Sequence, residues 1–176
     1  MKGENNQNLG QLLPMNEARM TKGRFIEYLK DSSRLDPENF KLGNVVIEGE
    51  IGPKNWPVVV GEHSIKRLRE RTYMVVDDIL CKAISILSNP LIGTEVVKHA
   101  IFWDEDTREA VDFNGDGITA TVVKLEAENM VFVFESGCEY IRLVTLWSGD
   151  VSKYVTYNSA VIFVNKDGAT SYPEQN

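Results

Sequence analysis

The sequence predicts an α+β domain in which N-terminal helices pack on an antiparallel sheet of four to six strands. Apolar residues recur at helical spacing in the first half of the chain, up to residue 87. Beyond residue 90, apolar and polar residues alternate in short segments that turn sequences separate. Helices followed by strands with short connections are typical of an α+β domain.

The length and composition predict one domain with flanking segments. The 176 residues are 43% hydrophobic, which is enough to bury a sizeable core. We expect a disordered lead-in over residues 1–14, an N-terminal helix with short strands over 15–60, a core α+β domain over 61–165 and a polar tail over 166–176.

The segments before residue 90 combine helical and strand patterns. Apolar spacing predicts helices over residues 16–30, 63–71 and 77–87. Alternation of apolar and polar residues predicts short strands over residues 45–51 and 56–60. They are expected to be separate short strands, or one strand pair at the edge of the sheet.

The segments beyond residue 90 alternate with period two and predict an antiparallel meander. The turn sequences DEDT, NGDG, EAEN and SGCE separate five strands, and a further strand pair is expected over residues 151–165. The five strands are expected over residues 96–103, 109–113, 118–125, 130–135 and 140–147.

Charge and targeting patterns favour a cytoplasmic protein that does not bind membranes. The net charge of −7 differs from the basic surface of a dedicated nucleic-acid binder, so RNA binding would require a local basic patch. The first residues lack the apolar region of a signal peptide, and no segment has the length of a membrane span. Cys81 and Cys138 are expected to be buried thiols, as in a reducing compartment.

The residue types and spacing of His63, Arg67 and Arg71 suit a catalytic site. Their spacing of four residues places all three on one face of a helix. An imidazole beside two guanidinium groups suits phosphoryl transfer in RNA, because the imidazole can take the proton of a 2′-hydroxyl while the arginines stabilise charge on the phosphate oxygens. This chemistry requires no metal and no cofactor. The alternative is an ordinary helix surface, on which the arginines are solvated or pair with Glu62, Glu70 and Asp77.

The segment HSIKRLRER at residues 63–71, followed by TYMVVDDI, resembles the His-x3-Arg-x3-Arg helix of small domains grouped with RelE-like toxins. These belong to the ribonuclease superfold of barnase, EndoU, colicin and RelE. The resemblance covers residues 61–149 and implies a helical pair on an antiparallel sheet of four or five strands. The sequence LVTLW at residues 143–147 is similar to the last core strand of that family, which implies that the Thr145 hydroxyl lies near the His and Arg row.

The chain departs from the family pattern in its long N-terminal segment, its C-terminal extension and its acidic hairpins. Residues 104–116 hold six carboxylates against Arg108 alone, a surface that disfavours RNA and suits a basic protein partner. The carboxylates belong to Asp104, Glu105, Asp106, Glu109, Asp112 and Asp116.

The same acidic stretch contains the opening of an EF-hand calcium loop, with Asp112, Asn114 and Asp116 at the spacing of the first ligands. Val123 stands where such a loop has its bidentate glutamate, and strand patterns replace the flanking helices. A hairpin turn is therefore the preferred interpretation, with calcium binding as the alternative.

His99 belongs to the predicted strand over residues 96–103 and is expected to be a half-buried structural residue. The alternative is a second acid–base partner for His63.

These patterns support two functions. The first is a metal-independent ribonuclease or toxin-like RNA-cleaving domain, with His63 as general base, Arg67 and Arg71 as phosphate ligands and Thr145 as an auxiliary hydroxyl. The second is a non-catalytic interaction module, such as a phage or mobile-element accessory protein, that binds a basic partner through the acidic hairpin surface.

Overall fold

The computed structural model describes residues 41–71, 76–104, 106, 109–112, 114–137, 140–151 and 159–172. The lead-in and the helix expected over residues 16–30 lie outside the described residues. In chain order the elements are β1 (Lys41–Gly49), β2 (Gly52–Val60), α3 (Glu62–Arg71), α4 (Val76–Leu87), α5 (Pro90–Lys98), β3 (Ile101–Asp104), β4 (Glu109–Asp112), β5 (Ala120–Leu125), β6 (Met130–Ser136), β7 (Ile141–Ser148), β8 (Ser159–Val164) and β9 (Thr170–Ser171).

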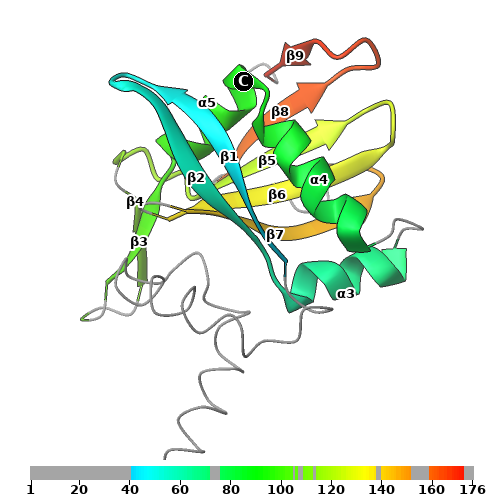
Figure 1. Cartoon of the computed structure of the whole chain (residues 1–176), viewed down its shortest axis with the longest axis horizontal. Coiled ribbons are helices and arrows are strands. Elements are labelled where there is room, and N and C mark those ends of the chain that lie inside the picture. Colours follow the sequence, from blue (N-terminus) through cyan, green and yellow to red (C-terminus); the bar gives the residue numbers. More distant parts are fainter. Residues whose placement is uncertain are drawn as a thin grey trace, which may run out of the picture.

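Seven strands form one mixed sheet in the order β1-β2-β7-β6-β5-β8-β9. β2 pairs with β7, and β5 with β8, in parallel, whereas the other neighbours are antiparallel. Figure 1 shows that this sheet curls into a half-barrel. The prediction of N-terminal helices on a four- to six-stranded antiparallel sheet is therefore wrong. The coarser prediction, a fold with both helices and a sheet, is confirmed.

The error in strand direction has a physical cause. Alternation shows which side chains of a strand are buried, but it does not show how the neighbouring strand runs. The meander of β5, β6 and β7 agrees with the sequence, because short connections force antiparallel neighbours. β2 and β7 are far apart along the chain, and a long crossover between two strands permits parallel pairing.

The strand expected over residues 96–103 is a helix for its first three residues. Asn89 caps α5 by accepting a hydrogen bond of 3.1 Å from the backbone N–H of Leu91, and Pro90 occupies the first turn, where proline is well tolerated. β3 begins only at Ile101 and pairs with β4 in a separate two-stranded sheet. The expected five-stranded meander is therefore reduced to three strands.

The main apolar core lies between the concave side of the sheet and the three described helices. α3, α4 and α5 all bury apolar side chains in the same cluster as the inward residues of β1, β2, β5, β6, β7 and β8. α4 approaches β1 closely at Gly43, where a Cβ atom would lie 2.9 Å from Ile84 Cδ1. A side chain at this position would require the end of the Ile84 side chain to shift.

A second apolar cluster lies on the other face of the same strands. Its buried members are Val122, Val131, Trp147 and Val161. Because β5, β6, β7 and β8 bury side chains on both faces, they form the centre of the domain.

α4 and α5 meet at a bend of 89°. Among the described residues, no single helix has the length and apolar character needed to cross a membrane, and these two meet those criteria only as a bent pair. Cys81, on α4, is exposed, so the expectation that it is a buried thiol is wrong. Cys138 lies outside the described residues.

Candidate functional site

A buried hydrogen bond fixes α3 against β7. β2 pairs with β7 as far as Val60, and the chain then turns at Gly61 into the helix. The hydroxyl of Ser64, which is 1% exposed, donates a hydrogen bond of 2.7 Å to the carbonyl of Leu143. The start of α3 is thereby held against β7 at the point where β2 ends.

The outer surface of α3 carries charged side chains. Ile65 and Leu68 are fully buried beneath it, whereas Lys66 and Arg69 are exposed. The Arg67 side chain is 37% exposed and forms an ion pair of 3.1 Å with Glu70, one turn along the helix. An exposed pair of this kind is weak and is easily exchanged for another anion.

The backbones of His63 and Arg71 belong to α3, but their side chains lie outside the described part of the chain. The backbone therefore places all three members of the predicted row on one helix. Of their side chains, only that of Arg67 is described.

Thr145 follows a β-bulge in β7. The pairing of β6 with β7 shifts between Val133 and Phe134, and Thr145 pairs with Val133. Val133 belongs to the second apolar cluster, so the half-buried Thr145 side chain lies on that face of the sheet. The buried side chains of α3 lie in the main core on the opposite face. No hydrogen bond or ion pair among the described side chains joins Thr145 to Arg67.

His99 is a second candidate site, and it is more buried than the sequence predicts. It caps the C-terminus of α5 and is 2% exposed. Its Nε2 atom lies 2.8 Å from Oε1 of Glu95, one turn earlier on the helix. The Tyr172 hydroxyl donates to the other oxygen of Glu95 at 3.2 Å. Burial and the neighbouring Glu95 carboxylate raise the pKa of Tyr172.

The second nitrogen of His99 faces an acidic loop. Nδ1 lies 3.3 Å from Oδ2 of Asp116 without forming a hydrogen bond. Asp116 Oδ1 accepts a hydrogen bond of 3.0 Å from the backbone N–H of Ile118, which keeps the pKa of this carboxyl below its ordinary value. Hydrogen bonding from Asn114 and the proximity of His99 act in the same direction, and partial desolvation opposes them.

This acidic loop is not the hairpin turn that the sequence predicts. β4 and β5 belong to different sheets, and the loop connects them. Its shape depends on side chains: Asp112 Oδ2 accepts a hydrogen bond of 2.9 Å from the backbone N–H of Gly117. Asn114 Nδ2 lies 2.8 Å from Asp116 Oδ2, the same oxygen that faces His99.

Part of this second site can be predicted from the sequence. Glu95 and His99 have the i, i+4 spacing of helical neighbours, although the alternation of apolar and polar residues around His99 predicts a strand. Asp116 reaches the histidine, and Tyr172 reaches Glu95, only through the tertiary fold, and no local pattern indicates these contacts.

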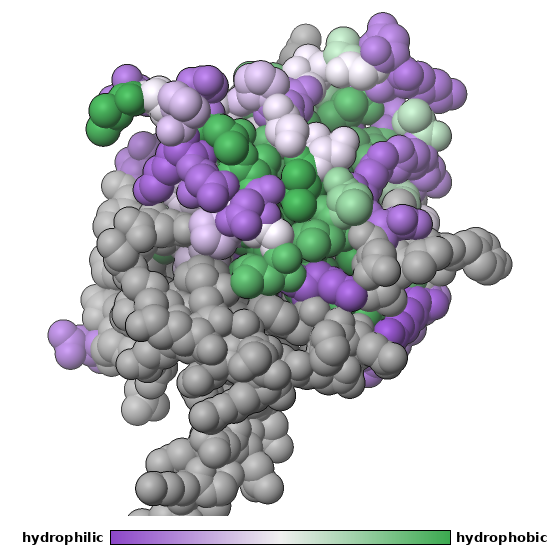
Figure 2. All heavy atoms as spheres, viewed as in Figure 1, coloured by the Kyte–Doolittle hydropathy of each residue, from purple (hydrophilic) through white to green (hydrophobic). Residues whose placement is uncertain are grey.

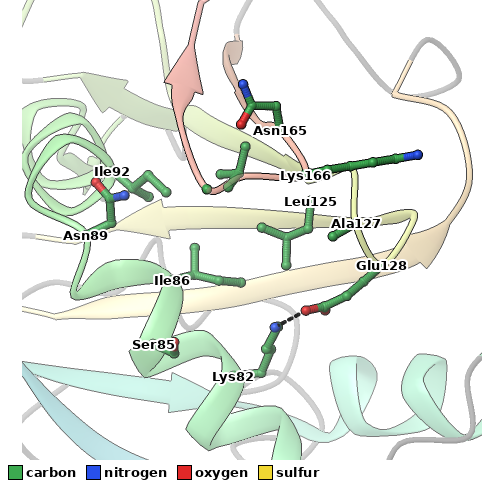
Figure 3. A pocket seen from close by; sticks show the side chains of 12 residues that line it. Lys82, Ser85, Ile86, Asn89, Ile92, Leu125, Ala127, Glu128, Asn165 and Lys166 are labelled. Atoms are coloured by element: carbon green, nitrogen blue, oxygen red, sulfur yellow. Dashed lines mark hydrogen bonds and ion pairs between the residues drawn. The ribbon is translucent and has the colours of Figure 1, made fainter.

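A pocket of about 230 Å³ lies between α4, the start of α5 and two turns of the sheet. Figure 3 shows the Lys82 and Glu128 side chains joined by an ion pair at its edge. The side chains of Asn89 and Asn165 at the rim already accept hydrogen bonds from backbone N–H groups. The side chains of Asn89 and Asn165 therefore stabilise the local backbone at these two positions. The apolar lining comes from Ile86, Ile92, Leu125, Ala127 and Val164.

Figure 2 shows an apolar strip in the middle of the face that carries β1 and α4, with hydrophilic residues on its border. On β1, Leu42 is 41% exposed and Val46 is 62% exposed. Isolated exposed apolar residues are common in folded proteins and do not by themselves define a binding site.

Comparison with protein-family models, curated proteins and solved structures found no match to the chain. The candidate sites therefore stand on their own geometry.

Proposed function

We propose that the chain is a metal-independent ribonuclease or toxin-like RNA-cleaving domain, and that α3 carries its active site. The observation that carries the proposal is the buried bond of 2.7 Å between Ser64 and Leu143. Ser64 is adjacent to His63 in the chain. The bond therefore fixes the start of the helix that carries the predicted row against β7.

The roles follow from the side-chain chemistry. His63 takes the proton of a ribose 2′-hydroxyl, and the 2′-oxygen attacks the adjacent phosphorus. The bond from phosphorus to the 5′-oxygen breaks, the 5′-oxygen takes a proton from water, and His63 returns its proton to the solvent. Arg67 and Arg71 stabilise the charge on the phosphate oxygens. Thr145, expected as an auxiliary hydroxyl, lies on the opposite face of the sheet and has no role in this site. The expected products are a 2′,3′-cyclic phosphate and a free 5′-hydroxyl.

The charge of α3 supports binding of RNA. The helix holds four arginine and lysine residues against two glutamates, although the whole chain has a net charge of −7. A phosphate group can replace Glu70 as the partner of Arg67, because the existing pair is exposed. RNA would thus bind at a local basic patch, and its affinity would fall as salt rises. A domain that acts on cellular RNA would work in the cytoplasm.

Activity on a fluorescent RNA oligonucleotide in EDTA tests the proposal. We expect cleavage by the native chain and a loss of about 100-fold or more with Arg67→Gln. Arg69→Gln is the matched control, because it removes the same charge from the same helix but lies outside the row of residues 63, 67 and 71. Equal losses in the two variants would show a general charge effect and contradict the assigned role.

A second function is favoured by the register of the small sheet. Asp104 and Glu109 are directly paired across β3 and β4. With the other acidic residues between positions 104 and 116 they give this part of the chain an excess of negative charge, which suits a basic partner. We propose, as the alternative, a non-catalytic interaction module that binds a basic protein partner through this acidic hairpin.

Calorimetry with an oligolysine peptide tests the alternative. Binding should weaken with salt and should be lost when Asp104→Asn and Glu109→Gln are combined. The control combines Glu48→Gln with Glu50→Gln, which removes two exposed carboxylates near the end of β1. If both double variants bind the peptide equally well, the hairpin is not the binding surface.

A further inference from the structure

His99 presents an unusual combination of burial and incomplete hydrogen bonding. Its side chain is 2% exposed, and Nδ1 has no hydrogen-bond partner among the described residues. A buried polar atom without a hydrogen bond is rare in folded proteins, because its desolvation is poorly compensated. Oδ2 of Asp116 lies 3.3 Å away, within the distance of an ion pair.

The other ring nitrogen determines what Nδ1 can do. Nε2 contacts Oε1 of Glu95 at 2.8 Å, and an ionised carboxylate can only accept a hydrogen bond. Nε2 therefore carries a proton. In the protonated ring Nδ1 pairs with the carboxylate of Asp116, whereas in the neutral ring Nδ1 holds a lone pair and two acceptors lie 3.3 Å apart. A cation between them would convert repulsion into attraction.

The arrangement around Glu95 is typical of metal-binding histidines. Such residues usually donate their remaining N–H to a carboxylate, which fixes the ring and strengthens the metal ligand. Glu95 provides this support and is itself held by the Tyr172 hydroxyl at 3.2 Å. Two contacts thus connect the exposed Tyr172 to Glu95, and Glu95 to Nε2 of His99.

The spacing of the two acceptors fits a transition-metal ion. Two ligands bound at about 2.0–2.1 Å in tetrahedral geometry lie roughly 3.3 Å apart, and the observed distance between Nδ1 and Oδ2 is 3.3 Å. The side-chain amide of Asn114 lies 2.8 Å from the same oxygen of Asp116. Rotation of this amide would bring its carbonyl oxygen to the same place.

We infer that His99 Nδ1 and Asp116 Oδ2, with the Asn114 side chain beside them, bind a divalent transition-metal ion such as Zn²⁺. Among the described residues, no group of three His, Cys, Asp or Glu side chains forms a metal cluster. Water molecules would complete the coordination shell on the side of Asp116, whose side chain is 32% exposed, so we expect moderate affinity. The ion would tie the acidic loop to the end of α5.

The nitrogen ligand separates this inference from calcium binding. Calcium prefers a shell of oxygen atoms, whereas an imidazole suits zinc and other first-row transition metals. The site is also independent of the proposed RNA cleavage, because none of its residues belongs to the row on α3. Chelation of the metal by EDTA should therefore leave the rate of RNA cleavage unchanged.

NMR of the imidazole nitrogens tests the site directly. The chain has two histidines, so comparison with His63→Ala assigns the signals of His99. Addition of Zn²⁺ to the EDTA-treated full-length chain should shift the Nδ1 signal of His99 and leave Nε2 protonated. This readout is specific to the site, which matters because the exposed Cys81 can bind zinc elsewhere.

Three variants separate the site from the surrounding fold. Asp116→Asn should weaken zinc binding at Nδ1 at least ten-fold, and Glu95→Gln should weaken it by about 10- to 100-fold. Asp167→Asn is the matched control, because Asp167 accepts a backbone N–H two residues ahead at 3.0 Å, as Asp116 does, but in the turn between β8 and β9. This variant should bind zinc as the native chain does.

The inference fails if millimolar Zn²⁺ leaves the Nδ1 signal unchanged, or if His99 stays protonated on both nitrogens at neutral pH in the presence of zinc. It also fails if Ca²⁺ shifts the signal as strongly as Zn²⁺, or if Asp116→Asn and Asp167→Asn bind equally well.

Discussion

The Ser64 hydroxyl donates a hydrogen bond of 2.7 Å to the Leu143 carbonyl, and both residues are buried. This bond connects the start of α3 to β7. The active site proposed above depends on the bond, because it fixes the helix that carries His63, Arg67 and Arg71.

Ser64→Ala should therefore lower the free energy of unfolding by about 1–3 kcal/mol, since it removes a buried hydrogen bond and leaves a carbonyl with one partner fewer. Ser88→Ala is the control: its hydroxyl also bonds a carbonyl at 2.7 Å, that of Ile84, but in an exposed position. We expect a change below about 0.5 kcal/mol there. Urea denaturation of both variants gives the comparison, and equal losses would refute the special role of Ser64.

Gly93 is required for the close packing of α5. A Cβ atom at this position would lie 2.5 Å from the carbonyl oxygen of Leu87 and 3.2 Å from Ile47 Cγ1. Gly93→Ala should lower the free energy of unfolding by about 1–3 kcal/mol, because the backbone atom cannot move aside cheaply. At Gly49 the nearest atom would be 3.4 Å from the added carbon, so Gly49→Ala should be tolerated. Thermal unfolding of the two variants measures the difference.

Asp116 should contribute to stability above its unfolded-state pKa. Its pKa is lowered in the fold, first by the backbone N–H of Ile118 and then by Asn114 and His99. A depressed carboxyl pKa means that the folded state releases the proton more readily, so the contribution is lost as pH falls through the folded-state value. Asp116→Asn should accordingly flatten the decline of stability below about pH 4. Parallel acid-side curves for the two proteins would contradict this assignment.

Arg67 should affect activity much more than stability. Its ion pair with Glu70 is exposed, so Arg67→Gln should change the free energy of unfolding by less than about 1 kcal/mol. If the residue binds a phosphate, the same variant should reduce cleavage of RNA by about 100-fold or more. Lys166→Gln, which removes an exposed charge in the turn between β8 and β9, should alter neither property.

Sequence periodicity predicted the elements that are joined by short connections. The predicted helices over residues 63–71 and 77–87 correspond to α3 and α4, and the strands over 118–125, 130–135 and 140–147 correspond to β5, β6 and β7. In these segments the buried face and the local chain direction are both encoded nearby.

The errors concern information that periodicity does not contain. The parallel pairings of β2 with β7 and of β5 with β8 join distant segments, whose direction no local pattern specifies. The alternation around His99 predicts a strand from residue 96, although Asn89 and Pro90 are helix-start signals and the helix continues to Lys98.

The candidate sites also combine features that local patterns predict with contacts that only the tertiary fold creates. Arg67 belongs to the predicted helix, but the bulge in β7 places the Thr145 side chain on the face opposite the buried residues of α3. The His99 site depends on Asp116 and Tyr172, which are brought to it by the tertiary fold.

Cleavage of RNA by His63→Ala is the most direct test of the proposed function. The native chain should convert an RNA oligonucleotide in EDTA to a product with a 2′,3′-cyclic phosphate, detected by mass spectrometry. His63→Ala should retain the native far-ultraviolet circular dichroism spectrum and lose this activity by at least about 100-fold. A folded His63→Ala protein that cleaves RNA as fast as the native chain, or a native chain that does not cleave RNA, would contradict the proposal.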